Sequence, residues 1–243
     1  MINFNNVDIP ISAILESINC DDNVISVIAY WSQMDGLGNK HSDIDLYVLT
    51  HSNTNVKCQW DYGITKISCP YINGVKFDIE YWEYDKVMQI IADIHNKSLV
   101  LIEDRVKLTV LSRIYKGICI FGKTIKEQIN YEELRNYIIY LYRWSCKSSY
   151  DDAKHFADVS DYTGTLTSNS FAVMAGMTAI NACNSKLILQ PKWVPKVYME
   201  TEANDLVTQY IDGFVFVNVT EQHLPFLVDN QLKIIKRMLL RLE

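Results

Sequence analysis

Glycine and proline, the residues that break regular structure, are few: the 243 residues include only nine glycines and five prolines. It has no internal repeat and no low-complexity segment, which excludes solenoid and collagen-like chains. No apolar run approaches the roughly 20 residues that a membrane-spanning helix needs. The first ten residues lack the basic and apolar regions of a secretory signal peptide. We therefore expect a cytoplasmic protein without a membrane partner.

Positive charge is also scarce, since 23 lysines and arginines stand against 29 aspartates and glutamates and the net charge is −6. A surface dedicated to nucleic acid needs a positive field, so a nucleic acid is not expected as a partner. The six cysteines are scattered and lack the Cys-x-x-Cys spacing of zinc sites. They are predicted to be thiols in a reducing compartment.

The chain does have the composition of an ordinary globular protein, with 49% hydrophobic and 21% charged residues. Its first part alternates apolar strand-like runs with helical patterns, which predicts an α/β (α+β) sheet with flanking helices. The run 24–31 is almost entirely apolar and is predicted to be a central strand, buried on both faces. A further strand is predicted to begin at Asp43. Others are predicted at Ile64–Cys69, Val75–Trp82 and Ile118–Phe121, with a hairpin turn at Ile72–Gly74. Helices are predicted at Ile11–Ile18, at Asp85–His95 with Asp85 as N-cap, and at Arg105–Tyr115.

The second part reads as helices only, with apolar residues at three- and four-residue steps. The domains are therefore predicted at 1–123, a catalytic sheet, and 124–243, a helical bundle that completes a substrate cleft. Small residues at 172, 175, 176 and 179 predict close helix packing. Helices are expected at Tyr131–Ser148, Leu166–Cys183, Val197–Ile211 and Leu224–Leu242, with a break at Asp161–Gly164 and a rigid connector at Pro191–Lys196.

The most informative residues are Asp43 and Asp45, which open one of the predicted strands. Side chains at positions i and i+2 of a strand point to the same face, so the two carboxylates project together. Two such charges stay ionised side by side only if a cation lies between them. Hard divalent cations suit that role, and Mg²⁺ suits it best where phosphates complete the coordination shell.

The loop before this pair has the composition of a phosphate-binding loop. Ser32 begins it, Gly36 and Gly38 allow a tight bend, and Ser42 ends it. A small hydroxyl, flexible glycines and free backbone N–H groups permit the close approach of a phosphate.

Ser32, Gly36 and the run Ser42–Leu46 together resemble the signature of the polymerase-β-type nucleotidyltransferases, in which a strand ends in Gly-Ser and a short loop precedes Asp-hydrophobic-Asp. Trp31 stands where that family usually has the glycine. Two consequences are open: a wider approach to the β- and γ-phosphates, or a stacking role for Trp31.

The resemblance implies a third carboxylate on a neighbouring strand. Asp78, flanked by Phe77 and Ile79, matches that position, and Glu80 on the same face is the reserve candidate. Asp43, Asp45 and Asp78 are then the expected metal ligands and catalytic residues, and Ser32, Gly36 and Ser42 the expected nucleotide-binding residues. Asp78 would complete a second metal site or accept a proton. Other candidate bases lie in the predicted bundle, at Glu132, Glu133, Asp151 and Asp152.

The layout is most similar to enzymes that inactivate aminoglycoside and lincosamide antibiotics. The implied activity uses one or two Mg²⁺ ions to move a nucleoside monophosphate, AMP by expectation, from an NTP to a hydroxyl of a small molecule. An acidic protein suits a polycationic acceptor of the aminoglycoside type. A toxin-like enzyme that modifies a protein or a tRNA and an inactive nucleotide-binding regulator are the alternatives, and the sequence is compatible with a homodimer. Other residues that could contact phosphate are Lys147, Lys154, Lys192 and His41.

Overall fold

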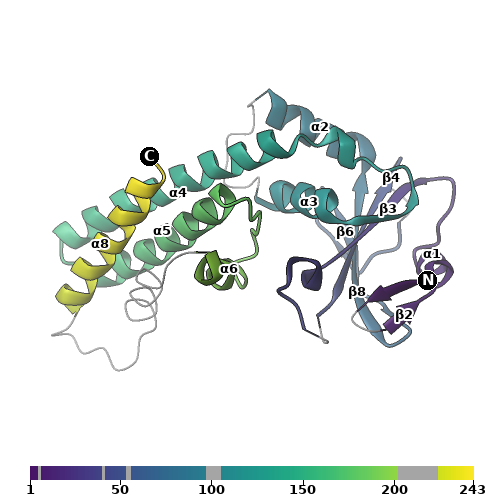
Figure 1. The fold of residues 1–243 in the computed structure, drawn as a ribbon, viewed down its shortest axis with the longest axis horizontal. Coiled ribbons are helices and arrows are strands. Elements are labelled where there is room, and N and C mark those ends of the chain that lie inside the picture. Colours follow the sequence, from purple (N-terminus) through teal and green to yellow (C-terminus); the bar gives the residue numbers. More distant parts are fainter. Residues whose placement is uncertain (5–6, 40–41, 53–55, 97–104, 202–223) are drawn as a thin grey trace. The chain divides into compact units, whose positions relative to one another are not determined.

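The computed structural model describes residues 1–4, 7–39, 42–52, 56–96, 105–201 and 224–243. Its backbone contacts divide the chain into two compact units, Met1–Leu99 with Val110–Tyr131, and Val100–Thr109 with Glu132–Glu243. The first is built on a β-sheet with helices, and the elements described in the second are helices, which confirms the predicted mixed fold class (Figure 1). The predicted domain boundary after residue 123 lies near this division but does not coincide with it.

The main sheet has the strand order β5-β6-β8-β4-β3-β9, and β7 pairs separately with β8. Strand β3 lies between β4 and β9 and is antiparallel to both, whereas β4 is parallel to β8. Five successive residues of β3, from position 26 to 30, are buried, which confirms the predicted central strand. The strands are β3 (Val24–Trp31), β4 (Ile44–Thr50), β5 (Trp60–Asp61), β6 (Lys66–Ser68), β7 (Tyr71–Ile72), β8 (Val75–Glu83) and β9 (Ile118–Gly122).

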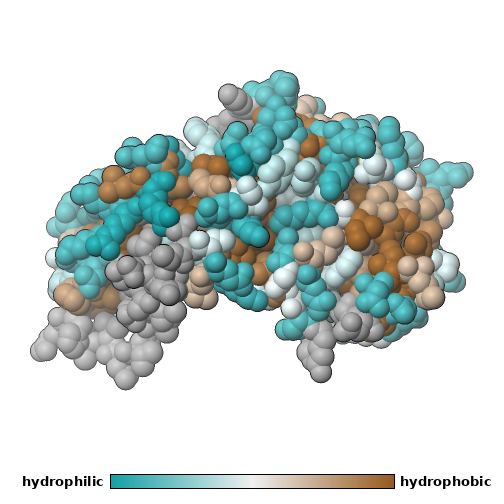
Figure 2. Space-filling model, viewed as in Figure 1, coloured by the Kyte–Doolittle hydropathy of each residue, from teal (hydrophilic) through white to brown (hydrophobic). Residues whose placement is uncertain are grey.

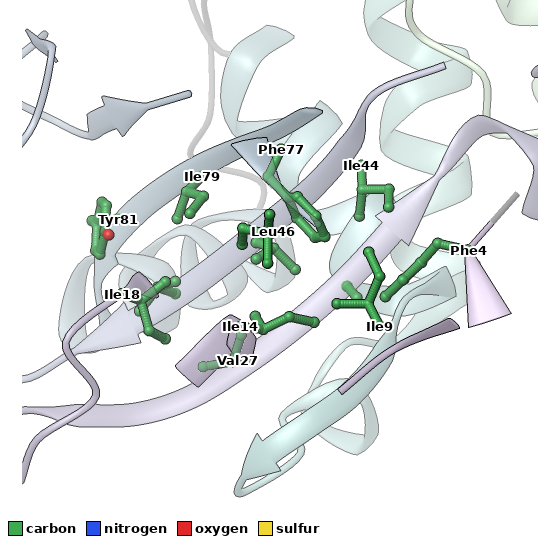
Figure 3. Packing of buried hydrophobic residues seen from close by; sticks show 13 residues of the cluster. Phe4, Ile9, Ile14, Ile18, Val27, Ile44, Leu46, Phe77, Ile79 and Tyr81 are labelled. Carbon is green, nitrogen blue, oxygen red and sulfur yellow. The ribbon is translucent and has the colours of Figure 1, made fainter. Parts of the chain in front are cut away.

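The two faces of this sheet differ, because successive side chains of a strand alternate between them. One face is apolar and is covered by α1 (Ile11–Ser17) and the hairpin of β1 (Ile2–Phe4) and β2 (Val7–Ile9) (Figure 3). Phe4 and Ile9 from the hairpin pack with Phe77 and Ile79 from β8, and all four are fully buried. The hairpin was not predicted, since strands of three residues are too short to show a periodicity.

The turn between β7 and β8 has the geometry that the sequence predicted. Asn73 and Gly74 both have positive φ, at 52° and 80°. A two-residue hairpin turn with two positive φ angles matches the twist of the strands that it joins, and Asn-Gly is the favoured pair.

Helices α2 (Tyr84–His95) and α3 (Arg105–Lys116) belong to the region after β8. The predicted N-cap of α2 is wrong: Glu83 is the N-cap, without a side-chain capping bond, and Asp85 lies in the first turn. The reason is that β8 continues to Glu83 and enters the helix directly. In the first turn the carboxylate of Asp85 still interacts favourably with the helix dipole.

The helical unit contains α4 (Tyr131–Asp158), α5 (Tyr162–Cys183), α6 (Val194–Thr201) and α8 (Leu224–Arg241). Helix α4 continues ten residues beyond the predicted Ser148. Helix α5 begins earlier than predicted, because the Asp161 side chain accepts a hydrogen bond from the Gly164 N–H at 2.9 Å and caps the helix. The expected break at 161–164 is therefore a helix start. The expected connector at 191–196 is partly helical, since Pro195 lies in the first turn of α6, where a missing N–H costs little.

The small residues of α5 allow the close packing that the sequence predicted. Ala172, Ala175, Gly176 and Ala179 are buried, and a Cβ on Gly176 would lie 3.1 Å from the Met238 sulfur on α8. The part of the prediction Val197–Ile211 that follows Thr201 lies outside the described residues.

Figure 2 shows a mostly hydrophilic surface, with hydrophobic residues gathered over the N-terminal hairpin and α1. None of the helices that the structure describes has the length and apolar character required to cross a membrane.

Candidate active site

The second face of the sheet carries the three predicted carboxylates. Ile44, Leu46, Phe77 and Ile79 point into the apolar core, so the alternate positions of β4 and β8 point to the opposite face. On these parallel neighbouring strands Asp45 lies directly opposite Asp78. Asp43 comes one residue before β4, on the same side as Asp45. The structure thus brings Asp43, Asp45 and Asp78 to one face of two adjacent strands.

A lysine lies between two of these carboxylates. The Lys76 ammonium is 2.7 Å from Asp43 Oδ2 and 3.2 Å from Asp78 Oδ1. Asp78 Oδ1 is itself inaccessible and its contact with Lys76 lacks hydrogen-bond geometry, so that contact is ionic. The hydrogen bond to Asp43, and further contacts with Asp78, raise the pKa of Lys76 although burial opposes the shift. Lys76 therefore stays charged and neutralises part of this carboxylate group.

An arginine pairs with the third carboxylate. Arg113, on α3, has Nη1 at 3.0 Å from Asp45 Oδ1 and also donates a hydrogen bond to the Tyr47 hydroxyl. Its guanidinium lies 5.3 Å from the centre of the Tyr30 ring. Burial alone would lower the pKa of Arg113, but Tyr47 and Asp45 raise it, and the result is a raised pKa. Arg113 is thus a fixed cation held by three partners.

Glu80, the reserve candidate, is deeper on the same face. It accepts a hydrogen bond from the Trp82 indole N–H at 3.1 Å. Burial raises the pKa of Glu80, and the charge of Asp78 adds to that shift. Because a metal ligand must be deprotonated, the Glu80 carboxylate, which bonds to an indole and has a raised pKa, is a less suitable metal ligand than Asp78.

A pocket of about 250 Å³ opens over these carboxylates. Asp45, Asp78 and Glu80 line it from β4 and β8, and the β5–β6 region contributes Trp60 and Tyr62, whose exposed fractions are 49% and 62%. Cys69 also lines the pocket; burial, together with its hydrogen bond to Asp78 and that carboxylate's charge, raises its pKa to about 11. Its thiol is therefore a weak nucleophile at neutral pH. The pocket combines acidic groups with two aromatic rings, and Ile67 completes its lining.

The predicted phosphate loop begins with a short 3₁₀ helix, Ser32–Asp35, which ends at Gly36 with φ of 74°. Gly38 approaches that helix closely: a Cβ there would lie 2.4 Å from Ser32 Oγ and 2.9 Å from the Gln33 nitrogen. Only glycine fits such an approach without displacing its neighbours. The Ser42 hydroxyl accepts a hydrogen bond from the Asn39 N–H at 2.9 Å and so closes the loop.

Asp35 anchors the loop to the rest of the site. Its carboxylate accepts a hydrogen bond from the Tyr30 hydroxyl and lies 3.0 Å from the Lys116 ammonium. The loop is therefore attached to β3 and to α3, which also carries Arg113. His41, expected in this loop, lies outside the described residues.

Trp31 directly precedes the loop, but its side chain packs against the apolar core. Its ring meets Phe4 edge to face, with centroids 4.9 Å apart and planes at 78°, among the residues that pack on the apolar core. Trp31 therefore contacts a core ring edge to face, and a wider approach to the phosphates stays a prediction.

The sequence did not predict four residues of the site: Lys76, Arg113, Lys116 and Asp35. A signal existed for Lys76, because it lies two residues before Asp78 and so shares its face. The same signal did not exist for Arg113 and Lys116, which reach the site only because α3 packs there.

The carboxylates have the chemistry of a divalent-cation site, since three hard oxygen donors come from adjacent strands. Within the part of the chain that the structure describes, no three His, Cys, Asp or Glu residues are gathered closely enough to hold a metal ion. Lys76 and Arg113 instead pair with the three aspartates. Lys76 bridges Asp43 and Asp78, and Arg113 pairs with Asp45.

Three of the candidates in the helical unit have a local partner in the structure. Glu132 pairs with Arg135 at 2.7 Å on the surface of α4. Lys154 lies over the Tyr150 ring and Lys192 over the Trp193 ring. A base or phosphate contact from Glu132, Glu133, Asp151, Asp152, Lys147, Lys154 or Lys192 stays a prediction.

No protein-family model matches the sequence, and no curated protein matches it. Among solved structures, the chain is similar to a nucleotidyltransferase-like protein from Exiguobacterium sibiricum, with 12% identity, a TM-score of 0.49, and coverage of 95% of this chain and 73% of that one. At this identity and TM-score the likeness assigns neither an activity nor a substrate to this chain.

Proposed function

We propose that this protein is a Mg²⁺-dependent nucleotidyltransferase that moves a nucleoside monophosphate from an NTP to a hydroxyl of a small molecule and releases pyrophosphate. ATP is the expected donor. The observation that carries the proposal is the placement of Asp43, Asp45 and Asp78 on one face of two adjacent strands, following a loop whose Ser32 and Gly38 are in close contact.

Asp43, Asp45 and Asp78 would hold the divalent cation, which supplies charge neutralisation at the triphosphate when bound. Ser32 and the loop amides bind the β- and γ-phosphates. Asp78 accepts the proton of the acceptor hydroxyl while the hydroxyl oxygen bonds to the α-phosphorus. The bond from that phosphorus to the bridging oxygen breaks, and pyrophosphate leaves with the electron pair. Positioning and charge stabilisation supply most of the rate in phosphoryl transfer.

The acceptor is proposed to be polycationic, of the aminoglycoside type. The pocket over Asp45, Asp78 and Glu80 has a negative floor, and Trp60 and Tyr62 form part of its wall. Carboxylates and aromatic faces both attract ammonium groups. The strand order places the loop after β3 on one flank of the carboxylates and the pocket toward β6 and β5 on the other. Donor phosphates and acceptor would therefore reach the carboxylates from opposite flanks.

A nucleotide-binding regulator without transfer activity is the second candidate. The observation that favours it is the pairing of all three aspartates with Lys76 and Arg113, which satisfies their charges without a metal. The two candidates differ in one product, since only the enzyme forms pyrophosphate.

The test is incubation with each labelled NTP and Mg²⁺ against a panel of aminoglycosides and lincosamides, with pyrophosphate measured in parallel. We expect label on one class of acceptor, and loss of transfer in the double variant Asp43→Asn, Asp45→Asn. The matched control is Asp61→Asn, an exposed aspartate of β5 in the same sheet that pairs with Lys66. Label on protein or tRNA would contradict the small-molecule acceptor, and absence of pyrophosphate with every NTP would favour the regulator.

A further inference from the structure

The position of Lys76 among the carboxylates is set by the pairing of β4 with β8. The register pairs Ile44 with Phe77, so the preceding residues, Asp43 and Lys76, lie side by side at the start of the two parallel strands. Lys76 also shares its face of β8 with Asp78, two residues later. Its ammonium bridges Asp43 Oδ2 at 2.7 Å and Asp78 Oδ1 at 3.2 Å.

This position conflicts with a metal ion on the same two carboxylates. The ammonium occupies the space beside Asp43 Oδ2 and Asp78 Oδ1 where a divalent cation that binds both oxygens would lie. A divalent cation near Lys76 would also be repelled, since like charges this close repel each other even at the effective dielectric of a protein surface. The two cations therefore cannot share the pair.

The two basic residues of the site differ in their freedom to leave. The Lys76 side chain is 37% exposed and pairs with Asp43 and Asp78, so water can solvate its ammonium when it leaves them. The Arg113 side chain is 16% exposed and is held by Asp45, Tyr47 and the Tyr30 ring. Release of Arg113 would leave a buried guanidinium without partners, which is costly. Lys76 is the residue that can exchange.

We propose that Lys76 and a divalent cation bind the Asp43–Asp78 pair in alternation. Lys76 is a positioning residue that holds the two carboxylates together in the metal-free protein, and its departure accompanies metal binding. The proposal rests on the proposed function for the identity of the metal site. It predicts that Lys76 weakens the affinity for metal and stabilises the metal-free fold.

The test is a titration of the full chain with Mn²⁺ alone, in which the electron paramagnetic resonance signal reports free Mn²⁺. We expect Lys76→Met to lower the dissociation constant about tenfold or more, because the competing charge is gone. Lys76→Arg keeps the charge and should stay within about threefold of wild type. The matched control is Lys86→Met, which removes a lysine whose partner is Glu83, outside the carboxylate group.

A second readout excludes a merely structural role. Without metal, Lys76→Met should lower the melting temperature, because Asp43 and Asp78 repel each other, and Mn²⁺ should raise it more than in wild type. An unchanged or weaker Mn²⁺ affinity in Lys76→Met, or no Mn²⁺ binding by either protein, would overturn the proposal. The two proposals fail separately. Tighter Mn²⁺ binding without pyrophosphate from any NTP would refute only the transfer, and Mg²⁺-dependent pyrophosphate release with unchanged Mn²⁺ affinity would refute only the exchange.

Discussion

The two faces of the sheet are made by the same strands and have opposite characters. On β4 and β8 the residues Ile44, Leu46, Phe77 and Ile79 are completely buried against the N-terminal hairpin and α1. Their immediate neighbours in the sequence carry the charges of the other face: Asp43, Asp45, Lys76, Asp78 and Glu80. One strand pair thus supplies both the core and the site, and alternation alone separates them.

The difference shows how a charged face is maintained beside a core. The apolar face gains free energy by removing surface from water. The charged face opposes folding unless each partly buried charge has a partner. Two cations, Lys76 and Arg113, pair with three aspartates of this face, whereas Glu80 accepts a hydrogen bond from Trp82. The face therefore has more carboxylates than cations. That residual charge is what a divalent cation or a cationic acceptor would neutralise.

The largest expected effect on stability comes from the apolar face. Phe77→Ala removes a fully buried ring whose centroid lies 5.9 Å from that of Phe4, so it should lower the free energy of unfolding by about 3–5 kcal/mol. Urea unfolding measures this. The control Tyr71→Ala, at a 72% exposed position of β7, should change the same quantity by less than about 1 kcal/mol. Equal effects would contradict the assignment of the core to this face.

A smaller effect is expected from the fixed cation of the charged face. Arg113→Met removes the ion pair with Asp45, and the low exposure of both side chains, 16% and 19%, implies a loss of about 2–3 kcal/mol. Adding Asp45→Asn removes the uncompensated charge and should recover part of that loss. Unfolding of both single variants and the double variant gives their coupling energy. Strict additivity would show that the pair does not interact.

The smallest effect is expected in the loop. Gly38→Ala places a Cβ against Ser32 and Gln33 and should cost about 1–2 kcal/mol and weaken nucleotide binding. Gly36→Ala meets no atom within 4 Å and pays only for its positive φ, about 1 kcal/mol. Thermal unfolding and nucleotide titration separate the two. A Gly38→Ala variant whose stability is restored by Ser32→Ala would identify the contact with the Ser32 hydroxyl as the cause. An unaffected Gly38→Ala would contradict the close approach.

The sequence predicted the parts of this molecule that depend on local pattern. The strand 24–31, the Asn73–Gly74 turn and the shared face of Asp43 and Asp45 follow from alternation and turn chemistry, and the structure has each of them. Helix ends were less accurate. Asp161 begins a helix that seemed to be broken there, because a capping bond is a local preference that competes with the signal of Gly164.

The partners of the carboxylates could not be predicted in the same way. Arg113 lies 68 residues after Asp45, and its contact depends on how α3 packs on the sheet. Trp31 was ambiguous for a similar reason, since its ring partner Phe4 belongs to a hairpin too short to be recognised. Pattern fixes which face a residue occupies, whereas tertiary packing decides what meets it there.

The most direct measurement is calorimetric titration with a non-hydrolysable ATP analogue, with and without Mg²⁺, because it needs no knowledge of the acceptor. We predict that wild-type protein binds the analogue only when Mg²⁺ is present, and that the double variant Asp43→Asn, Asp45→Asn weakens this binding at least about 100-fold. The circular dichroism spectrum of the double variant should match that of wild type, and its unfolding should remain cooperative. Binding that is independent of Mg²⁺, or equal in the folded double variant, would contradict a metal-assisted nucleotide site on this face of the sheet.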